Sequence, residues 1–267
     1  MLRSYFPMRK LPIIVLLSGC LPVFGWGPEG HSLIARIAEA QLTAATRARV
    51  AEILGPGTSL ASIASWADEV RRSRPQTANW HFIDIPISRP HLDMARDCPH
   101  GDCVIAEIES LERSLRDPAL PAARRREDLM FLVHFVGDMH QPLHCSDNGD
   151  KGGNDVRVEF AGHSTNLHAL WDSGLVGRIG TEEQLLPALS AASARNRRKW
   201  SKGTVEQWAE ESHKAARKTV YARLPQPSGD APRAISTAYE RAADPLIELQ
   251  IEKAGARLAR VLNETLP

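Results

Sequence analysis

The sequence predicts an all-α protein that folds as a single, mainly helical domain. Apolar residues recur at helical spacing through most of the 267 residues, and only Val156–Phe160 alternates in the way a strand does. The chain shows no break in composition and no internal repeat that would indicate a second domain. A chain of this length can bury a substantial single core.

Helical periodicity picks out nine segments. Thr43 and Ser62 are expected to begin helices, and Asp117-Pro118 to end one. Clusters of proline and glycine mark the loops, at 55–57, 118–121, 149–153 and 225–232. The predicted helices are Gly30–Leu42, Thr43–Leu54, Ser62–Arg72, Val104–Leu115, Arg124–His140, Leu167–Leu175, Glu182–Ala194, Thr204–Val220 and Ala234–Leu262.

The N-terminus has the pattern of an export signal. Three basic residues and no acidic one precede an apolar stretch, Leu11–Leu17, that is too short to cross a bilayer as a stable helix. We therefore expect residues 1–25 to be a signal peptide and Trp26 to begin the mature chain, a single domain over residues 26–267. Two alternatives stay open: a buried N-terminal helix, and a lipoprotein cleavage box that would leave a lipid-bearing Cys20 as the first residue.

The charge of the mature chain limits the ways in which it could bind a polyanion. Loss of residues 1–25 removes three positive charges, so the formal net charge changes from +1 to −2. A nucleic-acid-binding protein of the usual basic kind does not have this charge. Bound metal would have to supply the positive charge. The expected location is secreted or periplasmic, without stable membrane insertion, and with a lipid anchor at Cys20 as the alternative.

The cysteines fit an oxidising compartment. Cys98 and Cys103 enclose a short loop and could form a local disulfide. Cys145 is then unpaired, and beside His144 it is either a buried spectator or an auxiliary metal ligand.

Histidines and aspartates at helical spacing are the clearest chemical signal. His134 and Asp138 stand four residues apart, so they project from one face of a helix that is apolar nearly all round. His144 follows the end of this helix, and His168 and Asp172 repeat the four-residue spacing. Buried carboxylates and imidazoles need pairing or a metal, and this is the ligand set of catalytic zinc.

Upstream residues add weaker signals of the same kind. Asp68 lies in an apolar helix and His81 among aromatic residues, although the first could be a cap and the second a core histidine. Directly after the expected cleavage, the free amine and the carbonyl of Trp26 could chelate a metal, with His31 as a third donor.

With these residues in view, the sequence resembles the secreted, zinc-dependent, single-strand-specific nucleases of plants, fungi and bacteria. These are similar in fold to the zinc phospholipases C. The resemblance covers the whole expected mature chain. It rests on Trp26-Gly-x-x-Gly-His31, Trp66-Ala-Asp68, Trp80-His81-Phe82-x-Asp84, His134-x3-Asp138-x5-His144, Gly152-Gly153-Asn154 and Asn166-Leu-His168-x3-Asp172.

The resemblance implies a cleft that holds three zinc ions, with Asp138 bridging the first and the third. The matching ligands are Asp68, His81, His134 and Asp138 for the first ion, His144, His168 and Asp172 for the second, and Trp26 with His31 for the third.

The resemblance also implies roles for residues around the metals. Phe82 matches a residue that stacks on a nucleobase, and Asp84 a carboxylate beside the metal-bound water or the base. Arg71 falls where the family has an arginine near the phosphate, and Asn154 is a further candidate for substrate binding. The Cys98–Cys103 loop matches a short disulfide loop of the family.

Two features depart from the family pattern. They are Cys145 and the polar stretch Ser146-Asp147-Asn148 after His144, so the shape of the substrate groove there is left open.

The implied function is that of a zinc-dependent endonuclease. It would act as a monomer on single-stranded DNA and RNA, bind nucleotides and leave 5′-phosphate products, with 3′-nucleotidase activity left open. Zinc would lower the pKa of bound water to roughly 7, and stacking on Phe82 would favour unpaired bases.

Two other functions compete with this one. A zinc phospholipase C is disfavoured by the short interval from Trp26 to His31 and by Asp172 in place of glutamate. A non-catalytic zinc-binding protein is disfavoured because the second zinc would have only three protein ligands.

Overall fold

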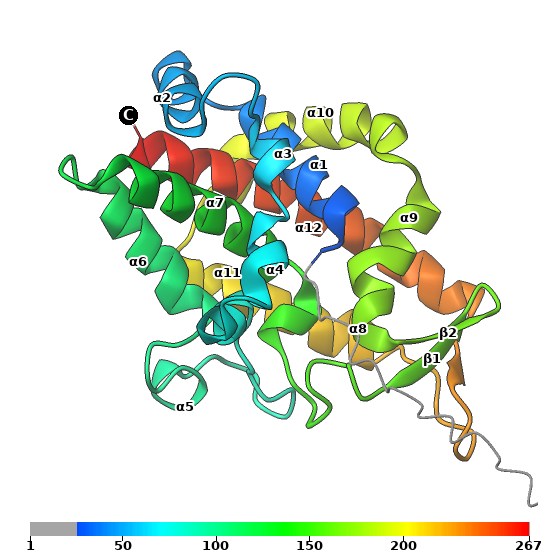
Figure 1. Cartoon of the computed structure of the whole chain (residues 1–267). Helices are drawn as coiled ribbons and strands as arrows, with labels where there is room; N and C mark the ends of the chain where they lie inside the picture. The colour runs from blue at the N-terminus through cyan, green and yellow to red at the C-terminus, as the bar shows by residue number, and fades with distance from the viewer. Residues whose placement is uncertain (1–25, 267) are drawn as a thin grey trace, which may run out of the picture.

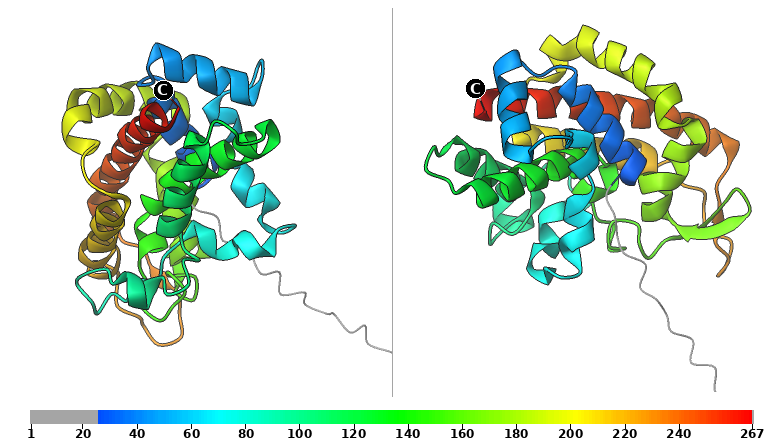
Figure 2. Two further views of the ribbon diagram at one scale, coloured as in Figure 1. Left: turned by 90° about the vertical axis from the view of Figure 1, so that its left-hand side faces the viewer. Right: turned by 45° about the horizontal axis from the view of Figure 1, so that its top comes forward.

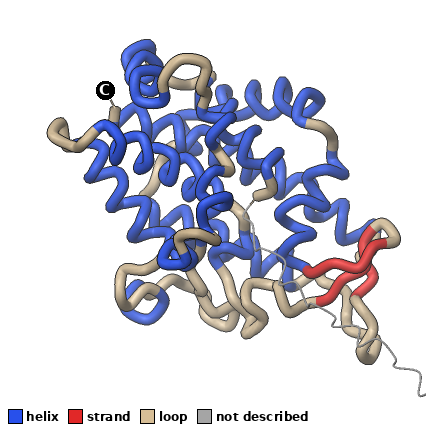
Figure 3. The backbone as a smooth tube through the Cα atoms, viewed as in Figure 1, coloured by secondary structure: helices blue, strands red, loops and turns tan. Residues whose placement is uncertain are grey.

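Helices make up most of the protein, and a small sheet lies at one end of it (Figure 1, Figure 3). The structure is a computed structural model and describes residues 26–266. The α-helices are α1 (Pro28–Glu39), α2 (Ala44–Leu54), α3 (Leu60–Ile63), α4 (Trp66–Arg71), α5 (Met94–Asp97), α6 (Val104–Arg116), α7 (Ala122–Met139), α8 (Leu167–Ala169), α9 (Leu175–Ile179), α10 (Glu182–Trp200), α11 (Val205–Ala215) and α12 (Thr237–Thr265). Two 3₁₀ segments, η1 (Pro75–His81) and η2 (Pro142–Cys145), and two π-helical segments, η3 (Leu170–Gly174) and η4 (Ala216–Tyr221), complete the helical part.

The sheet has the strand order β2–β1–β3. β1 (Arg157–Phe160) pairs antiparallel with β2 (His163–Asn166) and parallel with β3 (Arg233–Ala234). The prediction of a strand at Val156–Phe160 is therefore confirmed. β2 and β3 were not predicted, because a polar four-residue strand and a two-residue strand carry no alternating pattern.

The core is built around α12, the longest helix. α1, α6, α7 and α10 all pack against it, and Figure 1 and Figure 2 show α12 running through the molecule with α1 and α7 beside it. Almost every side chain from Asp128 to Met139 of α7 is buried, as the apolar sequence predicts. The polar residues of this helix are therefore placed in the interior.

Several helix starts and ends agree with the sequence. Thr43 caps α2 by accepting a hydrogen bond from the N–H of Thr46, and Asp117 follows the last residue of α6. The predicted helix Thr204–Val220 agrees with the structure to within one residue at each end, whereas α10 runs six residues beyond its predicted end at Ala194. The second π-helical segment carries α11 on to Tyr221, and α10 reaches Trp200.

The predicted helix Ser62–Arg72 is wrong in its detail. Two short helices, α3 and α4, cover this part, and Ser59 rather than Ser62 caps the first. The helix breaks after Ala64, and the carbonyl oxygen freed there lies 2.7 Å from Nδ1 of His134. The predicted start at Ala234 is also wrong, since Ser236 caps α12 and residue 234 pairs in the sheet.

The expected signal peptide and Cys20 lie outside the described residues. Within residues 26–266, no helix is both long and apolar enough to cross a membrane.

Candidate metal centre and substrate pocket

Three groups of buried histidine and aspartate side chains could each hold a metal ion. Within each group the nitrogen and oxygen ligand atoms all lie within 4.8 Å of one another. In the order used below, the groups are Asp68/His81/His134, His31/His134/Asp138 and His144/His168/Asp172. The second group contains the residue expected to bind the third ion, His31, and the third group contains the residues expected to bind the second ion. The first two groups share His134 and therefore adjoin.

The first group joins α4, η1 and α7. Nε2 of His134 lies 3.5 Å from Oδ1 of Asp68 and 3.2 Å from Nδ1 of His81. Asp138, one turn further along α7, places Oδ2 3.0 Å from Nε2 of His134 and 2.9 Å from Nδ1 of His81. Four ligand-type residues from three segments thus face a common centre, as the resemblance predicts for the first ion.

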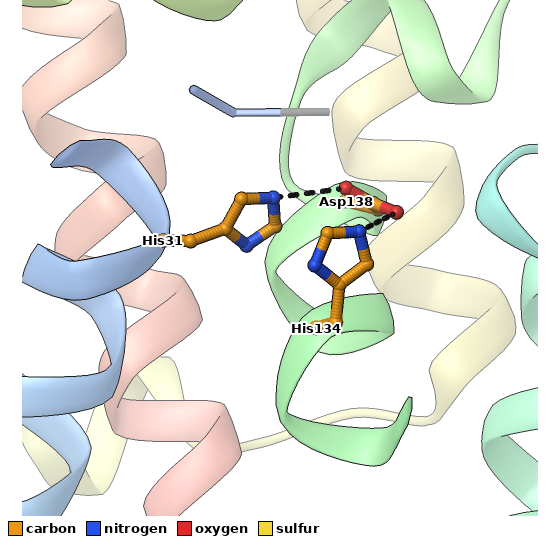
Figure 4. A group of neighbouring side chains, drawn as sticks. All are labelled: His31, His134 and Asp138. Carbon is orange, nitrogen blue, oxygen red and sulfur yellow. Dashed lines mark ion pairs between the residues drawn. The ribbon is translucent and has the colours of Figure 1, made fainter. Parts of the chain in front are cut away.

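His31 of α1 reaches the other oxygen of Asp138 (Figure 4). Its Nε2 lies 3.2 Å from Oδ1 of Asp138, and its ring stacks on that of His134 with centroids 4.1 Å apart. The close approach requires Gly137, because a Cβ there would lie 2.7 Å from Nδ1 of His31. Asp138 therefore presents one oxygen to each of two neighbouring groups, the geometry of a bridging carboxylate.

The third group comes from η2, α8 and η3. Nε2 of His144 and Nε2 of His168 face each other at 3.1 Å, and Oδ2 of Asp172 lies 3.5 Å from Nε2 of His168.

Main-chain carbonyls orient three of the imidazoles. Nδ1 of His134, His144 and His168 each lies 2.7 Å from a carbonyl oxygen. These carbonyls belong, in that order, to Ala64, His81 and Gly152. An Nδ1 that donates to a carbonyl carries the proton, so each Nε2 keeps its lone pair when the imidazole is neutral. The Nε2 lone pairs of His144 and His168 then face each other and repel. A cation bound by both nitrogens would remove this repulsion.

Unpaired buried atoms also fit a cation. His31 Nε2, Asp68 Oδ1 and Asp138 Oδ1 have no hydrogen-bond partner among the described residues. The 3.2 Å approach of His31 to Asp138 has the distance but not the angle of a hydrogen bond. A buried unpaired polar atom costs about 1–3 kcal/mol, so several in one place are explained by a bound ion better than by packing.

Burial keeps three of the imidazoles neutral, the form that binds metal. It lowers the pKa of His31, and it lowers the pKa of His81 to about 4 and that of His168 to about 3.

Two other residues of the three His/Asp groups, His134 and Asp172, hold a proton when no metal is bound. Burial opposes the charge on His134, but the carboxylates of Asp138 and Asp68 outweigh it and raise the pKa of His134 well above its usual value. Burial raises the pKa of Asp172 well above its usual value. A metal ion would displace these protons.

The start of the expected mature chain lies beside the third group. Trp26 is fully buried, and the N–H of Gly27 donates to the carbonyl of Asp172 at 2.7 Å. A Cβ on Gly27 would clash with the hydroxyl of Ser173. The carbonyl of Gly27 in turn accepts from the N–H of His31 at 3.1 Å, so this segment connects the second and third groups.

A pocket of about 280 Å³ opens beside His168. Its lining includes all four residues for which the resemblance implies a role in substrate binding or catalysis: Arg71, Phe82, Asp84 and Asn154. Arg71 is oriented by a 3.1 Å hydrogen bond from Nη2 to the carbonyl of Ala78.

Asp84 stands at the mouth of this pocket with an exposed side chain. The pocket wall nevertheless removes part of its hydration, and with the negative charges of Asp147 and Asp97 this raises the pKa of Asp84 to about 6. A carboxylate with such a pKa can accept a proton near neutral pH.

Comparison with known proteins identifies the family of the chain. The S1/P1 nuclease family model matches residues 26–267. The chain belongs to the S1/P1 nuclease family. Nuclease P1 of Penicillium citrinum is 33% identical over 268 residues, covering 90% of this chain and 97% of that protein. Endonuclease 4 of Arabidopsis thaliana is 31% identical over 98% of this chain and 95% of its own length. Nuclease S1 of Aspergillus oryzae is 34% identical over 62% of this chain.

Membership of the S1/P1 nuclease family confirms the resemblance seen in the sequence. It favours a nuclease over the phospholipase C and over a zinc-binding protein without catalysis. The assignment of single residues as ligands stays a prediction, which the geometry supports.

The cysteine predictions are answered by the structure. Cys98 and Cys103 form the disulfide. The thiol of Cys145 is fully buried and donates to the carbonyl of Met139, and burial raises its pKa. Cys145 is therefore a buried thiol rather than a thiolate ligand.

Gln141 was missed by reasoning from the sequence. It is fully buried, and its Nε2 donates to Oδ1 of Asp172 at 2.6 Å, while its Oε1 accepts from the N–H of Leu143. The only signal in the sequence was its place between two ligand-type histidines, because an amide on a buried turn gives no periodic pattern.

Proposed function

We propose that this chain is a zinc-dependent endonuclease that hydrolyses single-stranded DNA and RNA. The observation that carries the proposal is a set of three neighbouring His/Asp groups, one of which contributes His168 to a pocket that Arg71, Phe82 and Asp84 also line. A duplex is too stiff to bring a phosphate to the bottom of such a pocket, whereas an unpaired base can leave the strand and stack on Phe82.

The proposed metal complement is three zinc ions, held by the nine residues assigned from the family resemblance. When bound, zinc supplies acidified water and neutralises charge on the phosphate. The donor set of imidazole nitrogens and carboxylate oxygens is one that zinc prefers. Asp138 would contribute to the sites of two ions, and the amine and carbonyl of Trp26 would contribute to the site of the third.

The residues of the pocket are proposed to bind and orient the substrate. Arg71 donates to the phosphate, Phe82 stacks on the base at the cleavage site, and Asn154 donates to the nucleotide. Asp84 orients the attacking water and accepts its proton. Cleavage at the 3′ oxygen would leave 5′-phosphate ends, and the same geometry would admit a 3′-nucleotide as substrate.

Export of the protein belongs to the same proposal. The first 25 residues would be removed in a secreted or periplasmic protein, and a lipid on Cys20 would leave extra residues before Trp26. The mature protein is proposed to act as a monomer.

A combined assay of metal content and activity tests the function. Protein purified without chelator should contain about three zinc equivalents by elemental analysis and should release acid-soluble nucleotides from heat-denatured DNA and from RNA. Native duplex DNA and phosphatidylcholine are the matched negative substrates. Retained nuclease activity after exhaustive EDTA dialysis, or hydrolysis of phosphatidylcholine in place of nucleic acid, would refute it.

The state of the N-terminus tests the role of Trp26. Mass spectrometry of the exported protein should find Trp26 as the first residue. A variant produced with one extra glycine before Trp26 should bind about one zinc equivalent fewer, because its amine is displaced. Equal zinc content in the two forms would remove Trp26 from the ligand set.

A further inference from the structure

A second pocket shares the loop of residues 147–154 with the pocket beside His168. Its volume is about 280 Å³, and its lining includes Asn148, Asp150, Arg217, Tyr221 and Arg233. Asp147, Lys151 and Asn154 of the same loop face the first pocket instead. One loop of fewer than ten residues therefore forms a wall of each pocket.

Two guanidinium groups give this second pocket its charge. Arg217 and Arg233 are both half-buried, and neither forms an ion pair with a described carboxylate. Each is held by a main-chain carbonyl: Nε of Arg217 donates to Ile87 at 2.8 Å, and Nη1 of Arg233 to Pro225 at 3.1 Å. The remaining N–H groups of both side chains are left to bind a ligand.

The one carboxylate in the lining belongs to Asp150, whose Oδ1 is hydrogen-bonded to the protein and whose buried Oδ2 has no hydrogen-bond partner among the described residues. Oδ1 of Asp150 accepts hydrogen bonds from the Tyr221 hydroxyl at 2.8 Å and from the N–H of Gly153 at 2.7 Å. Two arginines against one aspartate leave the pocket positive, in a mature chain whose formal net charge is negative. A positive pocket next to the active one suits the phosphates of the same strand.

We propose that this pocket is a second phosphate-binding subsite. In it, Arg217 and Arg233 bind a phosphate of the same strand at some distance from the bond that is cleaved. The inference rests on the proposed function. It requires that a strand passing the first pocket crosses the loop at 147–154. On this proposal a dinucleotide fills the first pocket alone, so the subsite should act on long substrates only.

The test compares substrates of two lengths. In the double variant Arg217→Gln/Arg233→Gln, KM for a 20-nucleotide single strand should rise about tenfold, with kcat unchanged, because two charge-assisted contacts are lost. KM for a dinucleotide should not change. The slope of log KM against log salt for the 20-mer should become shallower by about 1.4, since each lost phosphate contact with a single strand contributes about 0.7.

The control removes the same charge elsewhere. Arg197→Gln/Arg198→Gln alters two exposed arginines of α10 that line neither pocket. If this control raises KM as much as the pocket variant, or if the pocket variant raises KM for both substrates equally, the proposal is wrong. Should the double variant fold poorly, Arg233→Gln alone should still show half of the salt effect.

A separate outcome distinguishes binding of free mononucleotide from binding of the strand. If the pocket takes only the product, the double variant will lose inhibition by 5′-mononucleotide without any change in KM for the 20-mer, which contradicts the strand subsite. Failure of the proposed function would show in the wild-type protein as no cleavage of either substrate. The anisotropy of a fluorescein-labelled 20-mer, which an inactive protein leaves intact, would then still measure the strand affinity of the variants.

Discussion

Asp84 and Gln141 represent two ways in which one side chain can serve this site. Asp84 lines the pocket that is proposed to bind the substrate, whereas Gln141 is buried and contacts the proposed metal centre through Asp172. Their substitutions should therefore affect different quantities.

We expect Asp84→Asn to lower kcat by at least about a hundredfold, because a positioned base contributes that much. The zinc content should not change. The wild-type rate should fall on acidification below about pH 6, since the pKa of Asp84 is about 6 and bound cations would lower it further. The variant should lack this acid limb.

The control for this substitution is Asp230→Asn in the exposed loop before β3, which should leave kcat and the pH profile intact. Unchanged turnover in Asp84→Asn would remove Asp84 from the mechanism.

We expect Gln141→Leu to weaken zinc binding or lower activity by about ten- to a hundredfold, the usual effect of losing a group that orients a metal ligand. Competition with a chromogenic chelator measures the affinity. Gln41→Leu is the matched control, because Gln41 is also a buried amide but donates to Ser193 far along the chain. Equal loss of zinc affinity in both variants would indicate a structural effect only.

At the scale of elements, the site depends on how closely α1 and α7 approach. Gly137 of α7 leaves the space that the ring of His31 fills from α1. Neither helix alone holds a complete group, because His31 and Asp138 come from different helices.

We expect Gly137→Ala to destabilise the fold by about 1–3 kcal/mol and to weaken zinc binding, because its Cβ would force the two helices apart. Gly177→Ala in α9 is the control, since no atom lies within 4 Å of a Cβ placed there. That change should be neutral or stabilising, as alanine is the better helix former. Thermal unfolding with and without EDTA measures both effects, and equal behaviour of the two variants would contradict the packing argument.

Across the whole molecule, metal binding should be coupled to stability and to protons. Ligand-type residues from seven segments, α1, α4, η1, α7, η2, α8 and η3, meet at the site, so bound zinc would link segments distant in sequence.

We expect EDTA to lower Tm by about 5–10 °C, which corresponds to about 2.7 kcal/mol for a ligand present at a hundredfold excess over Kd. Zinc binding should also release about one to two protons, because His134 and Asp172 have raised pKa values and must lose their protons to bind metal. Zinc affinity should therefore rise with pH through these raised values.

Calorimetry in two buffers of different ionisation enthalpy measures the protons released. The variant Asp172→Asn, which has no carboxyl proton to lose, is the control and should release fewer. A Tm that does not respond to EDTA would show that the metal sites do not bridge the fold.

Much of this protein could be predicted from local sequence. Thr43 as a cap, α7 as a buried helix and the pairs His134/Asp138 and His168/Asp172 all depend on residues at most four positions apart, where helical geometry alone places the side chains.

The tertiary structure decided the rest. Three contacts join residues that lie tens to more than a hundred positions apart. They are Ala64 with His134 at the helix break, Gln141 with Asp172, and Gly27 with Asp172. The second pocket likewise joins distant parts of the chain, because Arg217 and Arg233 line it together with the loop of residues 147–154. Spacing along the chain determines which side chains share one face of an element, but only packing determines which faces meet. The types of residue in the site could therefore be predicted from the sequence, whereas the contacts that orient them and the second pocket could not.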